Sequence, residues 1–208
     1  MGFLAEQISE LRSRISSEMS AFRLAHTLGV EREAKRIGDI YMPELSDELC
    51  VAALLHDITK ELSTEEHIEL LIRNGVSVGE NDRRSPKVLH SKTAEYEARD
   101  RFSEFTNERI CQSLRYHTTG NKDMTLFDAI IYLADYIEDT RTFEDCVFLR
   151  EHFWSAEPQK MSRDDRERHL WETVLLSLDM TVRDIESSGG YISVETLEAR
   201  EAIAKKLA

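Results

Sequence analysis

The chain has 208 residues and a formal net charge of −13 at pH 7, with 41% hydrophobic and 32% charged residues. This balance is typical of a globular protein and excludes a disordered or membrane-embedded chain. The acidic surplus argues against nonspecific nucleic-acid or anionic-membrane binding, because both need a basic surface. We therefore expect one principal domain over residues 1–208, with neither nucleic acid nor membrane as a partner.

The scarcity of residues that interrupt helices predicts an all-α fold. The chain has only three prolines and eight glycines, and apolar residues recur at helical spacing. In chain order, we predict a helix or helix pair over 3–41, stopped near Pro43. An apolar helix then begins with Ser46 as its N-cap and ends at His56-Asp57. The next helix starts with the capping box of residues 63–66 and ends at residues 74–75.

The second half of the chain continues the helical pattern after a polar loop over 76–88. Thr125 with Asp128 is typical of a helix N-terminus, and Trp154 and Trp171 are expected to pack the C-terminal helices. The remaining helices are predicted at 89–103, 106–116, 125–139, 143–154, 163–187 and 194–207. We see no internal repeat and no strand hairpin.

The cysteines and the N-terminus indicate a reducing setting. Cys50, Cys111 and Cys146 are too far apart for a Cys-x-x-Cys motif, so we interpret them as reduced and mostly buried thiols. The first residues lack a secretory signal, and Glu6 stands where an N-myristoylation motif at Gly2 needs Ser or Thr. We expect a cytoplasmic protein.

Histidine and aspartate residues recur at or near the ends of predicted helices. An ionised Asp57 at the end of an apolar helix is costly unless a positive group compensates it. Adjacent residues of a helix diverge by about 100°, so His56 and Asp57 can straddle a site between two cations. The other candidates of this kind are His26, His90, His117 and Asp135. Imidazole and carboxylate without thiolate favour iron, manganese, nickel or zinc over calcium or magnesium alone.

Spacing alone is a weak signal here, because these residues come from five segments. The amino acids that flank each candidate add to this signal. His26, His56-Asp57 and Asp135 resemble the signature of the HD-domain metal-dependent phosphohydrolases, and His90 and His117 resemble its two-metal subset. The segments 23–30, 53–60, 116–120 and 131–141 are similar to those of the bacterial symmetrical bis(5'-nucleosyl)-tetraphosphatases. This resemblance extends from about residue 8 to 141, and again loosely over 192–202.

The resemblance implies a fold, a reaction and a cofactor. It implies an HD-type helical bundle with its metal-binding core over about 15–141 and a C-terminal helical extension over about 142–208. Members of the family split diadenosine tetraphosphate into two ADP molecules at a di-iron centre. A small-molecule nucleotide is thus the expected partner. The family's cofactor implies two metal ions, with iron preferred over manganese, nickel or zinc. Their ligands would be His26, His56, Asp57, His90, His117 and Asp135.

Positive and polar side chains near these positions are candidates for substrate contacts. We assign catalytic roles to Asp57, as the residue bridging two metals, and to Lys60 and Arg141, as cations near the developing phosphate charge. The candidates for substrate binding are Arg23, Lys60, Thr118, Thr119, Gly120 and Arg141. Ordinary alternatives remain: Lys60 as a solvated lysine at a helix end, Arg141 as an ion-pair partner of Glu138 or Asp139, and Arg23 as structural.

Departures from the family pattern leave the substrate less well defined than the metal site. No Gly or Pro stands beside His90, and the segment after Arg141 lacks the expected proline. Another nucleotide or alarmone phosphohydrolase, or a non-catalytic nucleotide-binding module, is therefore an alternative function. His67, His152 and His169 lie on charged, amphipathic stretches and are expected to face solvent. The C-terminal helices are expected either to cover the site or to mediate a homodimer.

Overall fold

The computed structural model describes residues 3–208, and within this range it contains helices and connecting segments but no strand. The helices are α1 (Ala5–Ser16), α2 (Ala21–Tyr41), α3 (Ser46–Leu55), α4 (Thr64–Arg73), α5 (Glu80–Arg84), α6 (Leu89–Arg101), α7 (Glu108–Tyr116), α8 (Leu126–Ile137), α9 (Glu144–Ser155), α10 (Arg163–Ser187) and α11 (Val194–Leu207). The all-α prediction is confirmed. None of the described helices has the length and apolar character that a membrane span requires.

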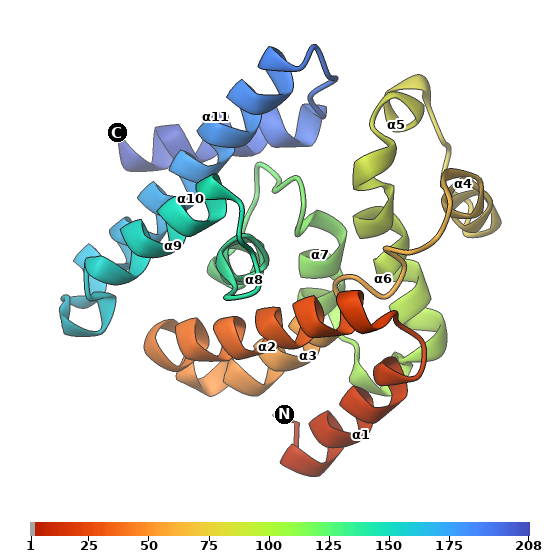
Figure 1. Ribbon diagram of the computed structural model, residues 1–208, viewed down its shortest axis with the longest axis horizontal. Coiled ribbons are helices and arrows are strands. Elements are labelled where there is room, and N and C mark those ends of the chain that lie inside the picture. The colour runs from red at the N-terminus through yellow and green to blue at the C-terminus, as the bar shows by residue number, and fades with distance from the viewer. Residues whose placement is uncertain (1–2) are drawn as a thin grey trace.

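The core is built around α3, whose residues 49–55 are buried on every side. Helices α1, α2, α7 and α8 all pack against it. Figure 1 shows α2 lying along α3, with α8 and α7 beside them. Because α3 is enclosed, the residues directly after its C-terminus, His56 and Asp57, are delivered to the interior rather than to solvent.

The C-terminal helices form a layer along one side of this core. Helix α10 packs on α8, α9 and α11, and α9 also packs on α8 (Figure 1). Trp171 is buried in this layer, and the half-buried Trp154 donates its indole N–H to Glu33 of α2 at 2.5 Å. Both tryptophans thus pack the C-terminal helices, as predicted, and Trp154 also joins α9 to α2.

Several helix ends lie where the capping residues place them. Ser63 accepts from the Glu66 N–H while the Glu66 carboxylate accepts from the Ser63 N–H, which is a complete capping box. Thr125 and Asp128 form the same reciprocal pair at α8. Gly75 follows α4 at φ 75°, a left-handed conformation that favours glycine.

Two local predictions were wrong. Ser46 is not the N-cap of α3, because the 3-10 turn Pro43–Leu45 leads directly into the helix and gives Ser46 helical angles; its hydroxyl donates to Asp39 instead. The segment 76–88 is not entirely loop, since α5 forms within it, begun by Gly79 whose N–H donates to the Asp82 carboxylate. Cys50, Cys111 and Cys146 are buried and free, as expected.

Candidate metal centre

The six predicted ligands meet in the interior of the bundle. They come from α2 (His26), the end of α3 (His56 and Asp57), the first turn of α6 (His90), the end of α7 (His117) and α8 (Asp135). Five of them are buried, and the Asp135 side chain is 18% exposed. Residues up to 109 positions apart in the sequence thus form one cluster, which we call the ligand cluster.

Asp57 occupies the middle of the ligand cluster, and its two oxygen atoms face different histidines. Oδ2 lies 3.6 Å from His26 Nε2 and 3.5 Å from His56 Nε2. Oδ1 lies 3.4 Å from His90 Nε2 and 3.7 Å from His117 Nε2. A carboxylate between two pairs of imidazoles has the arrangement needed to bridge two cations.

Asp135 adds a second carboxylate on the His26 side. Its Oδ1 is 3.0 Å from His26 Nε2 and 3.8 Å from His56 Nε2. Three groups have ligand atoms that all lie within 4.8 Å of one another: His26–His56–Asp57, His56–His117–Asp135 and Asp57–His90–His117. The first and third groups share only Asp57, so the geometry provides two neighbouring positions rather than one.

Unpartnered buried atoms show that the ligand cluster fits metal ions. Both His56 Nε2 and Asp57 Oδ1 are buried without a hydrogen-bond partner, and leaving such a group unsatisfied costs about 1–3 kcal/mol. Imidazole nitrogen with carboxylate oxygen suits divalent transition metals. Among the unpartnered buried side-chain atoms of the described residues, these two are therefore the ones that a metal ion would engage.

Local backbone geometry fixes three of the four imidazole rings. In His56, His90 and His117, Nδ1 lies 2.6, 2.8 and 2.8 Å from the carbonyl oxygen three residues earlier. Because a carbonyl oxygen only accepts, Nδ1 carries the donated hydrogen and Nε2 is left to face Asp57. His26 differs, since its Nδ1 lies 3.0 Å from the carboxylate of Glu138.

Burial and charge set the protonation of these groups. Burial by itself would raise the pKa of Asp57, but the charge of His56 and the close imidazoles of His117 and His56 hold it well below its usual range. Burial, followed by the charge of Lys60, lowers the pKa of His90. For His26, burial opposes the charged form, yet hydrogen bonds to Asp135 and Glu138 raise its pKa to about 9.

Three cations surround the ligand cluster. Arg23 pairs with Asp57 Oδ2, and Arg141 donates from Nη2 to Asp135 Oδ1 at 2.7 Å. The Lys60 ammonium lies 2.9 Å from His90 Nε2 and 3.9 Å from Asp57 Oδ1, with a third of its side chain exposed. All three predicted cations are thus at the cluster, each beside one of the candidate ligands.

The segment after α7 reaches the ligand cluster through Thr118. Thr118 Oγ1 lies 3.0 Å from His90 Nε2, which places it at the cluster. Thr119 is buried and its hydroxyl donates to the Gly120 carbonyl, while Gly120 adopts φ 65° beside Ala199 of α11. The geometry brings Thr118 to the site, and a substrate role for Thr119 and Gly120 stays a prediction.

Two histidines expected at the surface are buried, so that expectation was wrong for His67 and His169. His67 Nδ1 lies 2.8 Å from the Thr93 hydroxyl, and His169 stacks on Phe153 with Nε2 3.1 Å from that residue's carbonyl oxygen. An amphipathic helix turns one face inward, and an imidazole can lie on that face when it has a hydrogen-bond partner. His152 is exposed, as expected.

Two hollows adjoin the ligand cluster. The Lys60 hollow, of about 390 Å³, is lined by Lys60, Leu62, Thr64, His67, Pro86, Lys87 and His90. The Arg141 hollow, of about 340 Å³, is lined by Asp135, Tyr136, Arg141, Phe143, Asp145, Cys146 and Asp184. The first therefore opens beside His90, on the Oδ1 side of Asp57, and the second beside Asp135, on the Oδ2 side.

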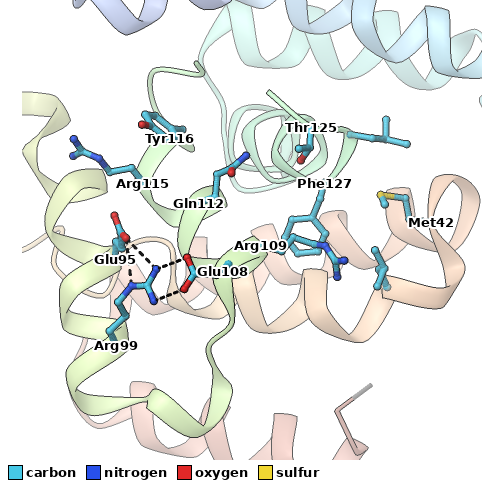
Figure 2. Close-up of a pocket in the computed structure, with 12 residues that line it drawn as sticks. Met42, Glu95, Arg99, Glu108, Arg109, Gln112, Arg115, Tyr116, Thr125 and Phe127 are labelled. Carbon is cyan, nitrogen blue, oxygen red and sulfur yellow. Dashed lines mark hydrogen bonds and ion pairs between the residues drawn. The ribbon is translucent and has the colours of Figure 1, made fainter. Parts of the chain in front are cut away.

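A larger cavity of about 470 Å³ lies elsewhere, between α6, α7 and α8 (Figure 2). Its Arg99 is held by Glu95 and Glu108, and its Arg109 pairs with Glu48. These carboxylates neutralise two of the three guanidinium groups that line the cavity, and none of the six candidate ligands lines it. Size alone therefore does not mark the site, and the chemistry is concentrated at the ligand cluster.

Comparison with known proteins shows which family the chain belongs to. The HD domain matches residues 23–140, a range that includes all six candidate ligands. The chain belongs to the HD domain family. It is 30% identical over 129 residues to the symmetrical bis(5'-nucleosyl)-tetraphosphatase of Bacillus subtilis (strain 168), covering 62% of this chain and 68% of that protein. The protein of the same name from Halalkalibacterium halodurans is 31% identical over 129 residues, covering 62% and 67%.

A solved structure extends the similarity to the C-terminal helices. The crystal structure of a predicted HD superfamily hydrolase involved in NAD metabolism, from Clostridium acetobutylicum, covers 99% of this chain and all of that one. The TM-score is 0.82 and the sequence identity is 28%. Helices beyond residue 140, outside the matched HD domain, thus belong to the same arrangement in both proteins. Together these findings make the chain an HD-domain hydrolase.

Sequence reasoning did not single out two residues beside the ligand cluster. Lys87 lines the Lys60 hollow, and Glu138 contacts His26 from the turn after α8. Lys87 gave no signal, because it lies in a polar segment without periodicity. For Glu138 the signal is indirect: Gly29 lies inside a helix, three residues after His26, and a glycine there indicates close approach of another group.

Proposed function

We propose that this HD-domain hydrolase splits dinucleoside tetraphosphates, diadenosine tetraphosphate first, symmetrically into two nucleoside diphosphates. Two divalent or mixed-valence transition metal ions would act at the ligand cluster, with iron preferred over manganese, nickel or zinc. The observation that carries the proposal is Asp57, whose two oxygen atoms face two separate pairs of histidines. The names of the two tetraphosphatase relatives support the choice of substrate.

The two hollows suit a substrate with a charged middle and two similar ends. Each hollow adjoins the ligand cluster and has a cation, Lys60 in one and Arg141 in the other. Their volumes of about 390 and 340 Å³ lie at the low end of the usual range of small-molecule sites, about 300–1,000 Å³. Cleavage in the middle of a symmetrical substrate requires an equal half on each side of the reacting phosphates.

Metal ions held by the ligand cluster would activate water for attack and neutralise phosphate oxygens. In the overall reaction, the water oxygen bonds to one central phosphorus, the central bridging P–O bond breaks and a proton is released. Lys60 and Arg141 then stabilise charge that grows on the leaving phosphate. Arg23 holds Asp57 and offers further positive charge to the phosphate chain.

Product analysis tests the proposal. The metal-loaded protein is incubated with diadenosine tetraphosphate, and the nucleotides are separated; ADP as the only product is the expected result. ATP with AMP, or no turnover, rejects the symmetrical reaction. Parallel incubations with nucleoside monophosphates, guanosine tetraphosphate and cyclic dinucleotides test the other reactions of HD phosphohydrolases. The Asp57→Ala variant, handled identically, excludes a contaminating hydrolase.

A further inference from the structure

We infer that Glu138 is the positioning residue that orients His26 as a metal ligand, and that position 29 is glycine because this carboxylate occupies the space of a side chain there. The inference rests on the metal-binding part of the proposed function. It concerns one of the two positions around Asp57, the one that includes His26 and His56.

His26 needs a partner that the other three histidines do not. His56 and His117 follow helix ends and His90 lies in a first turn, and in each the ring meets the backbone carbonyl three residues earlier. His26 lies inside α2, where backbone carbonyls are engaged in the helical ladder. A side-chain acceptor must therefore fix its ring, and Glu138 Oε1 lies 3.0 Å from Nδ1.

Glu138 is itself held in place. Its side chain is fully buried, and its carboxylate accepts from the Thr140 N–H at 2.7 Å and the Thr140 hydroxyl at 2.6 Å. Arg150 of α9 donates to the carbonyl oxygens of Ile137, Glu138 and Arg141 at 2.6, 2.5 and 2.7 Å. The turn that carries Glu138 is thus fixed from both its own residues and the C-terminal layer.

Gly29 provides the space for this carboxylate. A Cβ atom at position 29 would lie 2.9 Å from Glu138 Cδ and would overlap Oε2 more deeply. Glycine in the middle of a helix costs about 0.5–1 kcal/mol relative to alanine, so its presence in α2 is unfavourable unless something requires it. The close approach of the Glu138 carboxylate is that requirement.

A carboxylate on the far nitrogen of a ligating histidine sets its tautomer and increases its basicity, and removing such a partner typically lowers metal affinity by about 10–100-fold. Because His90 and His117 are oriented independently, we expect Glu138→Ala to weaken one of two metal positions by that factor and to spare the other. Glu138→Gln keeps an acceptor oxygen and should restore most of the affinity.

The test is a Co²⁺ titration of the purified, metal-stripped full chain, followed by visible absorption and checked by elemental analysis. We expect two equivalents bound by the unchanged protein and one tight plus one weakened equivalent in Glu138→Ala. Gly29→Ala should reproduce this loss by displacing the carboxylate. The double variant should lose no more than Glu138→Ala alone, because the overlap no longer exists.

Gly38→Ala is the matched control, because it also places a methyl group on α2 but against Leu49, away from the ligand cluster. It should lower stability without selective loss of one metal position. Unchanged binding of both equivalents in Glu138→Ala and Gly29→Ala, or additive losses in the double variant, would overturn the inference. Should Glu138→Ala not fold, Gly29→Ala and Glu138→Gln decide the question by the same titration.

The titration needs no substrate, so its result is separate from the proposed reaction. Selective loss of one position without any turnover would reject the substrate and keep the role of Glu138. Turnover of the substrate, together with unchanged binding at both metal positions in the variants, would keep the substrate and reject the role of Glu138.

Discussion

Replacing Lys60 by methionine should reduce kcat more than it raises KM. The ammonium lies 3.9 Å from Asp57 Oδ1 and 2.9 Å from His90 Nε2, so a phosphate oxygen reaching the cluster from the Lys60 hollow meets it directly. Removing one preorganised group that stabilises transition-state charge typically costs about 10²–10³ in kcat, or about 2.7–4 kcal/mol. With 33% of the side chain exposed, water screens the charge, and we expect the lower end, about 10²-fold.

The assay is steady-state hydrolysis of diadenosine tetraphosphate at full metal occupancy, with the metal content of each preparation measured. Lys87→Met is the control, because Lys87 lines the same hollow but is the more exposed lysine of the two. It should change KM by a few-fold and leave kcat nearly unchanged. A kcat for Lys60→Met within about threefold of the unchanged enzyme, a barrier difference of only about 0.7 kcal/mol, would refute the role of this charge.

Three further outcomes follow from the packing and charges. Asp57→Ala should abolish metal uptake and hydrolysis while circular dichroism shows unchanged helicity, because buried apolar residues hold α3; retained activity would contradict the bridging role. Phe102→Ala should lower the free energy of unfolding by about 3–5 kcal/mol in urea, since the ring is fully buried. Burial raises the pKa of Glu33 above 4.5, although a hydrogen bond from Trp154 and the charge of Arg36 oppose this shift. The folded state therefore binds this proton more tightly than the unfolded state does. As a result, the free energy of unfolding falls as pH rises above about 4.5. Glu33→Gln should therefore raise the melting temperature at neutral pH, with the gain vanishing below pH about 4.5; an equal gain at both pH values would contradict this.

Capping chemistry explains why much of the fold was predictable. The observed bounds of α10 and α11 coincide with the predicted ranges 163–187 and 194–207, because Ser162 and Ser193 cap the two helices and Gly189 follows the first at φ 68°. Ser46 misled for a physical reason. A hydroxyl before an apolar run favours an N-cap only if that residue has non-helical backbone angles, and the 3-10 turn Pro43–Leu45 gives Ser46 helical angles instead. Local sequence does not report that turn.

The candidate ligands were recognisable from the sequence motifs around them, whereas the groups that support them were not. His26, Asp57 and Asp135 stand in segments that resemble a known family, and the structure brings them together. The partner of His26 is separated from it by 112 positions, and on sequence alone Glu138 is one acidic residue among 40. Its role depends on a tertiary contact, which no helical periodicity encodes.

The C-terminal layer contacts the metal site's supporting turn, although all six candidate ligands precede this layer in the sequence. Arg150 of α9 holds the turn that carries both Glu138 and Arg141. One guanidinium group therefore fixes the backbone of the residue that contacts His26 and of the residue that pairs with Asp135. The same charge neutralises the carbonyl end of α8, where the helix dipole is negative. Helix α9 therefore supports the ligand cluster through this turn without supplying any of the six candidate ligands.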